Sequence, residues 1–448
     1  MSTPTKGPSG AAASDFRIPA KSSWTGAWRI AAAVGCLGLG IAAVGWFKDP
    51  TRFAFSYLFG YVVSLSLALG SLFFVLVQFV TKAGWGVTVR RLAELLMRPM
   101  LVFAVLSIPL FISIPRLFPW AGAKHAEAAE SHEASPLAEE RGLSELEPAA
   151  MRSLPRAAPQ KLEKAVEAGE ESIVAHKRFY LNQRFFQVRL VLYLFIWFWL
   201  ADRYFGWSSE QDKTKALRNT ASAQSFAPPA LILFGFSLTF FAFDWLLSLD
   251  ATWYSTIFGV YAFASCAMFN MAVLILLSLA LRRSGLMGDA VNVEHYHDMG
   301  KLLFGWISFW SYVSFAQFFL VWYSNIPDEV AWFHKRWSEN GGTWKPVTAA
   351  IVVMHFFVPF WFLMSRNVKR RTTLLATAAG CMVVMHVVDI YWVVMPNLGA
   401  FAPNPVDFGC LVGIFGVYFA FVLRSMEGFP LVPIGDPRLS RALEYENA

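Results

Sequence analysis

A histidine and an aspartate stand three positions apart near the C-terminus, in a stretch that is otherwise almost wholly apolar. They are His386 and Asp389 of the segment "MHVVDIYW", inside the run from Leu374 to Met395. On a helix, positions i and i+3 share one face about a turn apart. The carboxylate can then fix the tautomer of the imidazole or accept its proton, so the pair is a candidate for proton transfer.

Other polar side chains occur in similarly apolar surroundings, and together they could form a ladder across a membrane. From the inside outward these residues are Lys301 and Asp298, then His355 and Gln317, then His386, Asp389 and Asp244. An ionisable group at mid-bilayer costs about 2.5 to 3.5 kcal/mol and usually faces a bundle interior or a wet cavity. The alternative is that each residue makes only an interhelical hydrogen bond, worth about 0.6 to 2 kcal/mol.

Two of these acids suggest an internal repeat. Asp244 in "FFAFDWLLSLD" and Asp389 lie on segments that run outward, and they occupy similar depths. If apolar segments 2 to 5 and 6 to 9 are two copies of a four-helix bundle, each acid lies on the last helix of its copy. Repeats commonly place functional sites in this way. His355 is followed one turn later by Pro359, which is expected to kink its helix and free a carbonyl.

The sequence carries no signature of a cofactor site. The four cysteines stand singly in four apolar segments, without CxxC, CxxCH or cluster spacing. Only two histidines lie inside the spans, whereas a b-type cytochrome needs facing axial pairs. No Walker loop or dinucleotide fingerprint occurs. We therefore expect no metal and no cofactor held covalently or by ligation, and any electrons would be carried by another subunit.

Composition places these residues in a membrane. The chain of 448 residues is 56% hydrophobic and 15% charged, with a mean hydropathy of +0.45. Apolar stretches of about 18 or more residues predict ten transmembrane helices and an all-α integral membrane protein. The predicted spans fall near 27–47, 54–80, 97–115, 186–204, 228–249, 255–281, 300–323, 346–365, 373–395 and 405–424.

The distribution of lysine and arginine predicts the topology. Outside the long hydrophilic segment 116–185, these residues concentrate on the side shared by both termini, which the positive-inside rule assigns to the cytoplasm. The net charge of +7 is thus mostly a topology signal, and no nucleic-acid partner is expected. The expected organisation is a disordered cytoplasmic tail (1–26), spans 1–3 (27–115), a periplasmic insertion (116–185), spans 4–10 (186–424) and a cytoplasmic tail (425–448). Gly409 and Gly413 of span 10 permit close helix contact and suggest a neighbouring subunit.

Three long motifs resemble a known family. They are "DWLLSLDATWYSTIFGVYAF", "HDMGKLLFGWISFWSYVSFAQFFLVWYSNIPDE" and "MHVVDIYWVVMPN". They are similar to the F-type membrane subunits of bacterial alternative complex III, within the wider NrfD-like, or polysulfide-reductase membrane-subunit, family. The resemblance implies two four-helix bundles, spans 2–5 and 6–9, flanked by spans 1 and 10, in the bacterial inner membrane.

The same resemblance implies a function and partners. The chain would be a subunit, without a redox centre of its own, of a quinol:electron-acceptor oxidoreductase of the respiratory chain. Partners would be a sibling NrfD-like subunit, an iron–sulfur protein, multihaem and monohaem cytochromes c, and lipid, with menaquinone or ubiquinone as the quinone. Asp244, His386 and Asp389 would handle quinol or protons, with Asp298, Lys301, Gln317 and His355 as a proton path.

Two other functions remain open from the sequence. The chain could be a purely structural anchor for the iron–sulfur and cytochrome subunits, with no quinone site of its own. It could also be a secondary transporter, although spans 5 to 9 lack the paired, glycine-broken helices that mark such sites.

Overall fold

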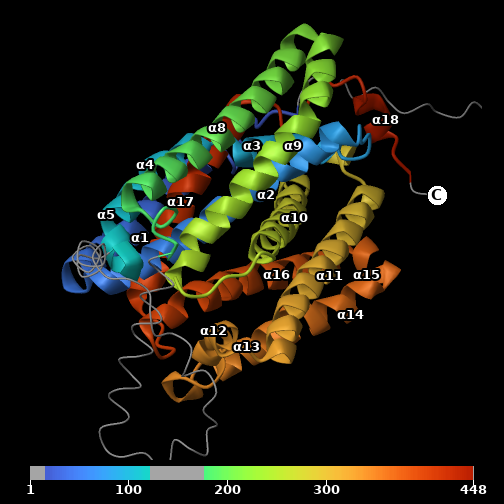
Figure 1. Cartoon of the computed structure of the whole chain (residues 1–448). Coiled ribbons are helices and arrows are strands. Elements are labelled where there is room, and N and C mark those ends of the chain that lie inside the picture. The colour runs from blue at the N-terminus through green and yellow to red at the C-terminus, as the bar shows by residue number, and fades with distance from the viewer. Residues whose placement is uncertain (1–15, 122–175, 447–448) are drawn as a thin grey trace, which may run out of the picture.

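Helices make up every regular element in the described parts of the chain. The computed structural model describes residues 16–121 and 176–446, which pack as one helical assembly (Figure 1). The prediction of an all-α protein is confirmed for these residues. Most of the predicted insertion 116–185 lies outside the described residues.

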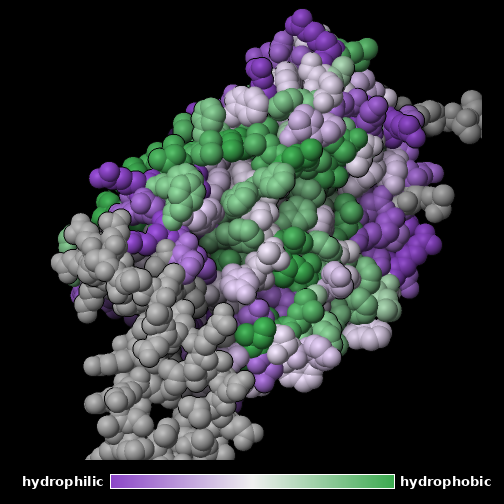
Figure 2. Space-filling model, in the orientation of Figure 1, coloured by the Kyte–Doolittle hydropathy of each residue, from purple (hydrophilic) through white to green (hydrophobic). Residues whose placement is uncertain are grey.

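Nine described helices are long and apolar enough to cross a membrane. A band of hydrophobic residues crosses the middle of the face drawn in Figure 2, and hydrophilic residues gather at the upper right, over the ends of α8, α9 and α15. This distribution is that of a protein embedded in a membrane. The nine are α1 (Ala27–Lys48), α2 (Pro50–Val80), α8 (Gln183–Thr214), α9 (Leu217–Trp245), α10 (Phe258–Arg283), α11 (Val293–Ser324), the composite α13 (Lys345–Ala350), η7 (Ile351–Phe357) and α14 (Val358–Met364), then α16 (Thr372–Val394) and α17 (Pro405–Gly428).

The third predicted span differs most from its expected form. In place of one helix over 97–115, the chain forms α3 (Val87–Met97), α4 (Met100–Leu106) and α5 (Ile108–Leu117), with a bend of 59° before α5. Pro99 and Pro109 break the helical hydrogen bonding near each junction. The helix therefore begins about three turns earlier than hydropathy suggests.

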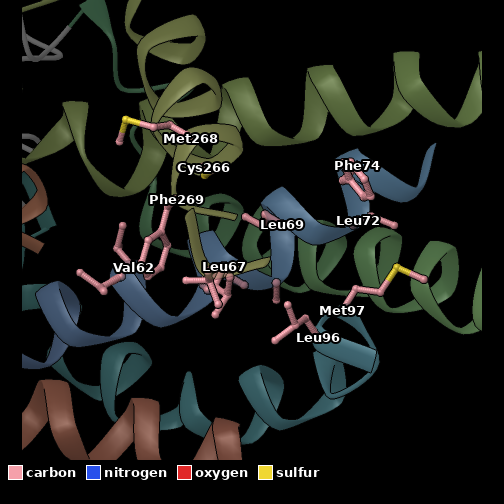
Figure 3. Packing of buried hydrophobic residues seen from close by; sticks show 14 of the residues in the cluster. Val62, Leu67, Leu69, Leu72, Phe74, Leu96, Met97, Cys266, Met268 and Phe269 are labelled. Atoms are coloured by element: carbon pink, nitrogen blue, oxygen red, sulfur yellow. The ribbon is translucent and has the colours of Figure 1, made fainter. Parts of the chain in front are cut away.

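Helices α2 and α10 form the centre of the assembly. Figure 3 shows apolar residues of α2 packed between residues of α10 and residues of α3. The two central helices approach closely at Gly70, where an added Cβ would lie 2.1 Å from the carbonyl oxygen of Cys266. Beside this contact, Ser71 donates a 2.7 Å hydrogen bond to Asn270. The first helix of each predicted bundle therefore packs against the first helix of the other.

Glycines join α1 to α17. A Cβ at Gly38 would lie 2.5 Å from the backbone nitrogen of Gly413, and one at Gly35 would lie 2.6 Å from that of Val417. The close contact expected for Gly409 and Gly413 therefore exists, but its partner is α1 of the same chain. This contact accounts for the glycines within the chain, and the neighbouring subunit stays a prediction.

The two described ends of the chain meet on one side of the assembly, which we call the termini end. The amide of Leu431 donates a 2.7 Å hydrogen bond to the carbonyl of Phe16. Residues 16–26 are therefore packed, in contrast to the disordered tail expected over 1–26, whose first fifteen residues lie outside the description. The C-terminal segment continues through α18 (Leu439–Leu443), drawn in red beside the C label in Figure 1.

Buried charges attach this C-terminal segment to α3. Arg90 binds Glu94 and Asp436, each at 2.8 Å, and Arg91 binds Asp212 of α8 at 2.5 Å. Although burial alone would raise it, hydrogen bonds from Arg438 and the charge of Arg90 hold the pKa of the Asp436 carboxyl below its usual range. These pairs explain how a helix with three charges can be wholly enclosed.

The opposite side, which we call the far end, is covered by α12 (Pro327–Trp337). Lys335 of this helix forms an ion pair with Asp250, which follows α9. Trp332 stacks on Trp253 with ring centroids 4.7 Å apart. Helix α12 therefore lies over the ends of the helices that carry the predicted site.

Candidate functional site

His386 and Asp389 form one hydrogen-bonded network with α10. Ser265 lies between them, with its hydroxyl 3.0 Å from Nδ1 of His386 and 3.3 Å from Oδ2 of Asp389. Tyr261, one turn earlier on α10, donates to Oδ1 of Asp389. On the other side of the imidazole, Nε2 lies 2.7 Å from the hydroxyl of Ser66 on α2. The predicted pair is thus linked through a serine that the sequence analysis did not select.

Helical periodicity explains this arrangement. His386 and Asp389 lie on one face of α16, as their spacing predicts, and Tyr261 and Ser265 lie on one face of α10 at i and i+4. The ring of His386 is held by stacking on Phe269, the next residue on that face, at 4.2 Å and 14° between planes. Residues at both ends of the network are fully buried, so water does not compete for these hydrogen bonds.

The network has two complete proton assignments. Ser66 donates to the carbonyl of Val63 at 2.7 Å, so its oxygen accepts the Nε2 proton of His386 in both. In the first, Ser265 donates to Nδ1 of a neutral His386 and accepts from a protonated Asp389. In the second, a charged His386 donates to Ser265, and Ser265 donates to the carboxylate of Asp389. The assignments differ by one proton moved through Ser265, and neither leaves a group of the network unpaired.

A small cavity adjoins the imidazole. Its volume is about 20 Å³, which is room for about one water molecule. The polar residues on its wall are Ser66, Ser265 and His386, and the remaining wall comes from apolar residues of α2, α9, α10 and α16. The cavity therefore lies where two helices of each predicted bundle meet, and a water in it would have polar partners only on the side of His386.

His355 joins the same region through Trp310. Its ring stacks on the indole of Trp310 at 3.8 Å, and its Nε2 lies 3.2 Å from the sulfur of Met268. The indole N–H lies close to Asp389 and Tyr261 but makes no hydrogen bond of good geometry with either. Nδ1 of His355 also lacks a partner among the described residues.

The helix around His355 is widened. Residues of η7 form a seven-residue π-helix that ends two positions before Pro359. The ring of a proline clashes with the carbonyl four residues earlier, which here belongs to His355. The expected kink is thus replaced by a π-helix, a feature often found at functional sites.

Asp244 does not belong to this network. Both of its oxygens accept from Arg189 of α8, at 2.8 and 2.9 Å, and Oδ2 also accepts from Tyr193 at 2.8 Å. The guanidinium of Arg189 is stacked against Tyr180 at 3.9 Å. Among the described residues, no hydrogen bond links Asp244 to α10 or α16. Among the described residues, Asp244 and Asp389 therefore belong to separate hydrogen-bonded groups.

The remaining ladder residues lie at the two ends. Asp298 binds Lys301 at 2.5 Å and accepts from Tyr445 of the C-terminal segment at 2.5 Å, at the termini end. Gln317 accepts a 3.3 Å hydrogen bond from Ser255 near the far end, rather than lying midway. Between Asp298 and Trp310, about 18 Å along α11, the inward residues are apolar. Among the described residues, these groups form no continuous polar chain with His355.

Asp389 differs from the other buried acids. It is the only fully enclosed carboxylate in the described stretches with no lysine or arginine at salt-bridge distance. The other buried carboxylates all have such a partner: Glu94 has Arg90 and Arg91, Asp244 has Arg189, Asp298 has Lys301, Asp407 has Arg52, and Asp436 has Arg90 and Arg438. An unpaired buried charge costs several kcal/mol. A proton that leaves Asp389 must therefore be matched by a charge change nearby.

No metal site is formed in the described ranges, where no group of three or more His, Cys, Asp or Glu side chains could hold an ion. The four cysteines, Cys36, Cys266, Cys381 and Cys410, are unpaired thiols on separate helices.

Fold and site together define a helical, multi-span membrane protein with a buried histidine–serine–aspartate network. The sequence matches no protein-family model and no curated protein. The resemblance to the NrfD-like family therefore stays a prediction.

Proposed function

We propose that the chain is a membrane subunit of a respiratory quinol:electron-acceptor oxidoreductase of the alternative complex III type. Its own contribution is proton transfer, with or without a bound quinol, through His386, Ser265 and Asp389. The redox centres belong to iron–sulfur and cytochrome c partners, and a sibling NrfD-like subunit completes the membrane part. The quinone is menaquinone or ubiquinone, and the complex resides in the bacterial inner membrane.

The observation that carries this proposal is that Asp389 is buried without a cationic partner and is linked to His386 by Ser265. An enclosed acid without a cation, joined to an imidazole by one hydroxyl, can exchange a proton within a fully hydrogen-bonded network. Oxidation of a quinol releases protons, which such a network would accept in steps. Of the three residues predicted to handle quinol or protons, we therefore keep His386 and Asp389, linked by Ser265, and assign Asp244 to its pair with Arg189.

For the topology, we propose ten crossings with both termini in the cytoplasm. The bent helices α3 to α5 count as one crossing, and the contact between Leu431 and Phe16 supports an even number. The central contact of α2 with α10 supports two bundles, spans 2–5 and 6–9, flanked by α1 and α17.

A second function, a structural anchor without a quinone site, is favoured by the paired acids. Asp244 with Arg189 joins the consecutive helices α9 and α8, and Asp407 with Arg52 joins α17 to α2, which is far away in the sequence. Such pairs hold an assembly together and transfer no proton while they remain closed. Under this second function, Asp389 would likewise be only an interhelical hydrogen-bond acceptor.

Quinol-dependent turnover of the intact complex separates the two functions. Asp389→Asn and His386→Gln keep side-chain volume and hydrogen bonding, and both are expected to lower turnover per assembled complex by at least about tenfold. The matched control is Asp407→Asn, another buried acid at the far end, which should lower thermal stability and leave turnover per assembled complex unchanged. Wild-type turnover in both Asp389→Asn and His386→Gln would support the anchor.

A further inference from the structure

One buried arginine has no acidic partner. Arg336, on α12, is 1% exposed, and no carboxylate of the described residues lies at salt-bridge distance from it. Of the other buried cations in the described stretches, only Lys369 also lacks an acid, and Lys369 lies at the termini end, where it donates to the carbonyl of Leu363 at 2.6 Å. Within the described ranges, Arg336 is therefore the one buried cation at the far end without an acidic partner.

The guanidinium of Arg336 is fixed on the end of α16. It donates to the carbonyls of Val393 at 2.7 Å and Trp392 at 3.1 Å, in the last turn of that helix. Its plane is covered by the ring of Trp332, 3.4 Å from the ring centroid. Cations are favoured at helix C-termini because the last carbonyls have no helical partner. Burial lowers the pKa of Arg336 to about 10, so the group stays charged at neutral pH.

This cation lies one helical turn beyond Asp389. Residues 392 and 393 follow Asp389 by three and four positions, about 5 Å along the helix axis. Tyr261, which donates to Asp389, also lies within electrostatic range of Arg336. Asp250, an acid that interacts electrostatically with Arg336, already has Lys335 as its partner. The unpaired buried arginine is therefore bonded to the turn of α16 that follows the unpaired buried acid.

We propose that Arg336 is a positioning residue that supplies the missing counter-charge for Asp389 through the end of α16. This inference rests on the proposed function, because it assigns an electrostatic role within the same network. A positive charge one turn away stabilises the carboxylate form of Asp389, which the second proton assignment requires. Asp389 is contacted by Tyr261 and Ser265 of α10, and Trp310 of α11 lies beside it. The titratable or charged groups one contact further away are His386 through Ser265, His355 through Trp310, and Arg336 through the last turn of α16.

The test is infrared difference spectroscopy of the purified full-length protein in lipid nanodiscs. The C=O band of neutral Asp389 is assigned as the band that Asp389→Asn removes, and its intensity is followed across pH. Arg336→Gln keeps an N–H donor for the carbonyls of α16 but removes the charge, so the ratio of ionised to neutral Asp389 at fixed pH should fall about tenfold. Arg336→Lys retains the charge and should stay near wild type.

Lys335→Gln is the matched control, because it removes a charge one position away on α12 and should leave the Asp389 band unchanged. An unchanged ratio in Arg336→Gln, or equal effects of Arg336→Gln and Lys335→Gln, overturns the inference. If Arg336→Gln does not accumulate, the reciprocal measurement applies. The guanidinium bands of Arg336 are assigned as those that Arg336→Lys removes, and they should shift in Asp389→Asn. Unshifted guanidinium bands in Asp389→Asn overturn the inference. Neither readout uses turnover, so the proposed function can fail separately.

Discussion

The buried pair of Arg189 and Asp244 is predicted to be structural, although the sequence placed Asp244 among the proton-handling residues. Arg189→Met removes two charge-assisted hydrogen bonds, of 2.8 and 2.9 Å, and leaves Asp244 with only Tyr193 as a side-chain partner. Each such bond contributes about 1.5 to 3 kcal/mol. The expected loss is about 3 to 5 kcal/mol of unfolding free energy, the range for breaking one side of a buried pair.

A double-mutant cycle measures this coupling. Asp244→Leu alone leaves a buried arginine and should cost a similar amount, whereas Arg189→Met with Asp244→Leu replaces both charges by apolar groups and should recover most of the loss. Unfolding free energies are measured in mixed micelles, and quinol-dependent turnover is measured per assembled complex. Full stability in Arg189→Met would refute the reasoning. Loss of turnover in a stable Asp244→Asn protein would show that Asp244 takes part in proton transfer after all.

Two further predictions concern packing and acid stability. Gly38→Val should separate α1 from α17, because a Cβ at this position meets the backbone of Gly413, and it should lower the unfolding free energy by about 1 to 3 kcal/mol or more. The control is Gly40→Val, whose side chain would face open space and should leave stability unchanged. Equal melting temperatures of the two variants would contradict this prediction. Asp436 has a pKa held below its usual range mainly by Arg438 despite burial, so its stabilisation is present above about pH 4 and is lost as pH falls through the lower folded-state value. The stability difference between wild type and Asp436→Asn should thus stay constant from about pH 5 to 8, at about 3 to 5 kcal/mol. It should shrink in stronger acid, and a difference that grows in acid would contradict the prediction.

Hydropathy and helical spacing predict much of this architecture. The apolar stretches locate the nine long helices, and the spacing of His386 and Asp389 correctly predicts that they share a face. These features depend on local periodicity, which a single segment displays. Helix starts are less accurate where charged residues lie inside the helix, as in α3, because the compensating Asp212 and Asp436 are distant in sequence.

The partners of each buried group could not be predicted, because they depend on which helices meet. Arg189 lies near the start of the predicted fourth span, but its partner Asp244 is 55 positions away, so the pair could not be predicted from spacing. Ser66 and Ser265 carry no distinctive signal, since serines in apolar helices commonly bond to their own backbone. One weak signal was available: Tyr261 and Ser265 stand at i and i+4 on a segment that also carries Asn270.

The central claim is that Ser265 passes a proton between His386 and Asp389. The most direct measurement compares quinol-dependent turnover of the assembled complex in Ser265→Ala and Ser265→Thr. Threonine keeps the hydroxyl, and its extra methyl borders the small cavity beside His386. Ser265→Thr should therefore retain most of the turnover, and Ser265→Ala should lose at least about tenfold. Wild-type turnover in Ser265→Ala would contradict the account.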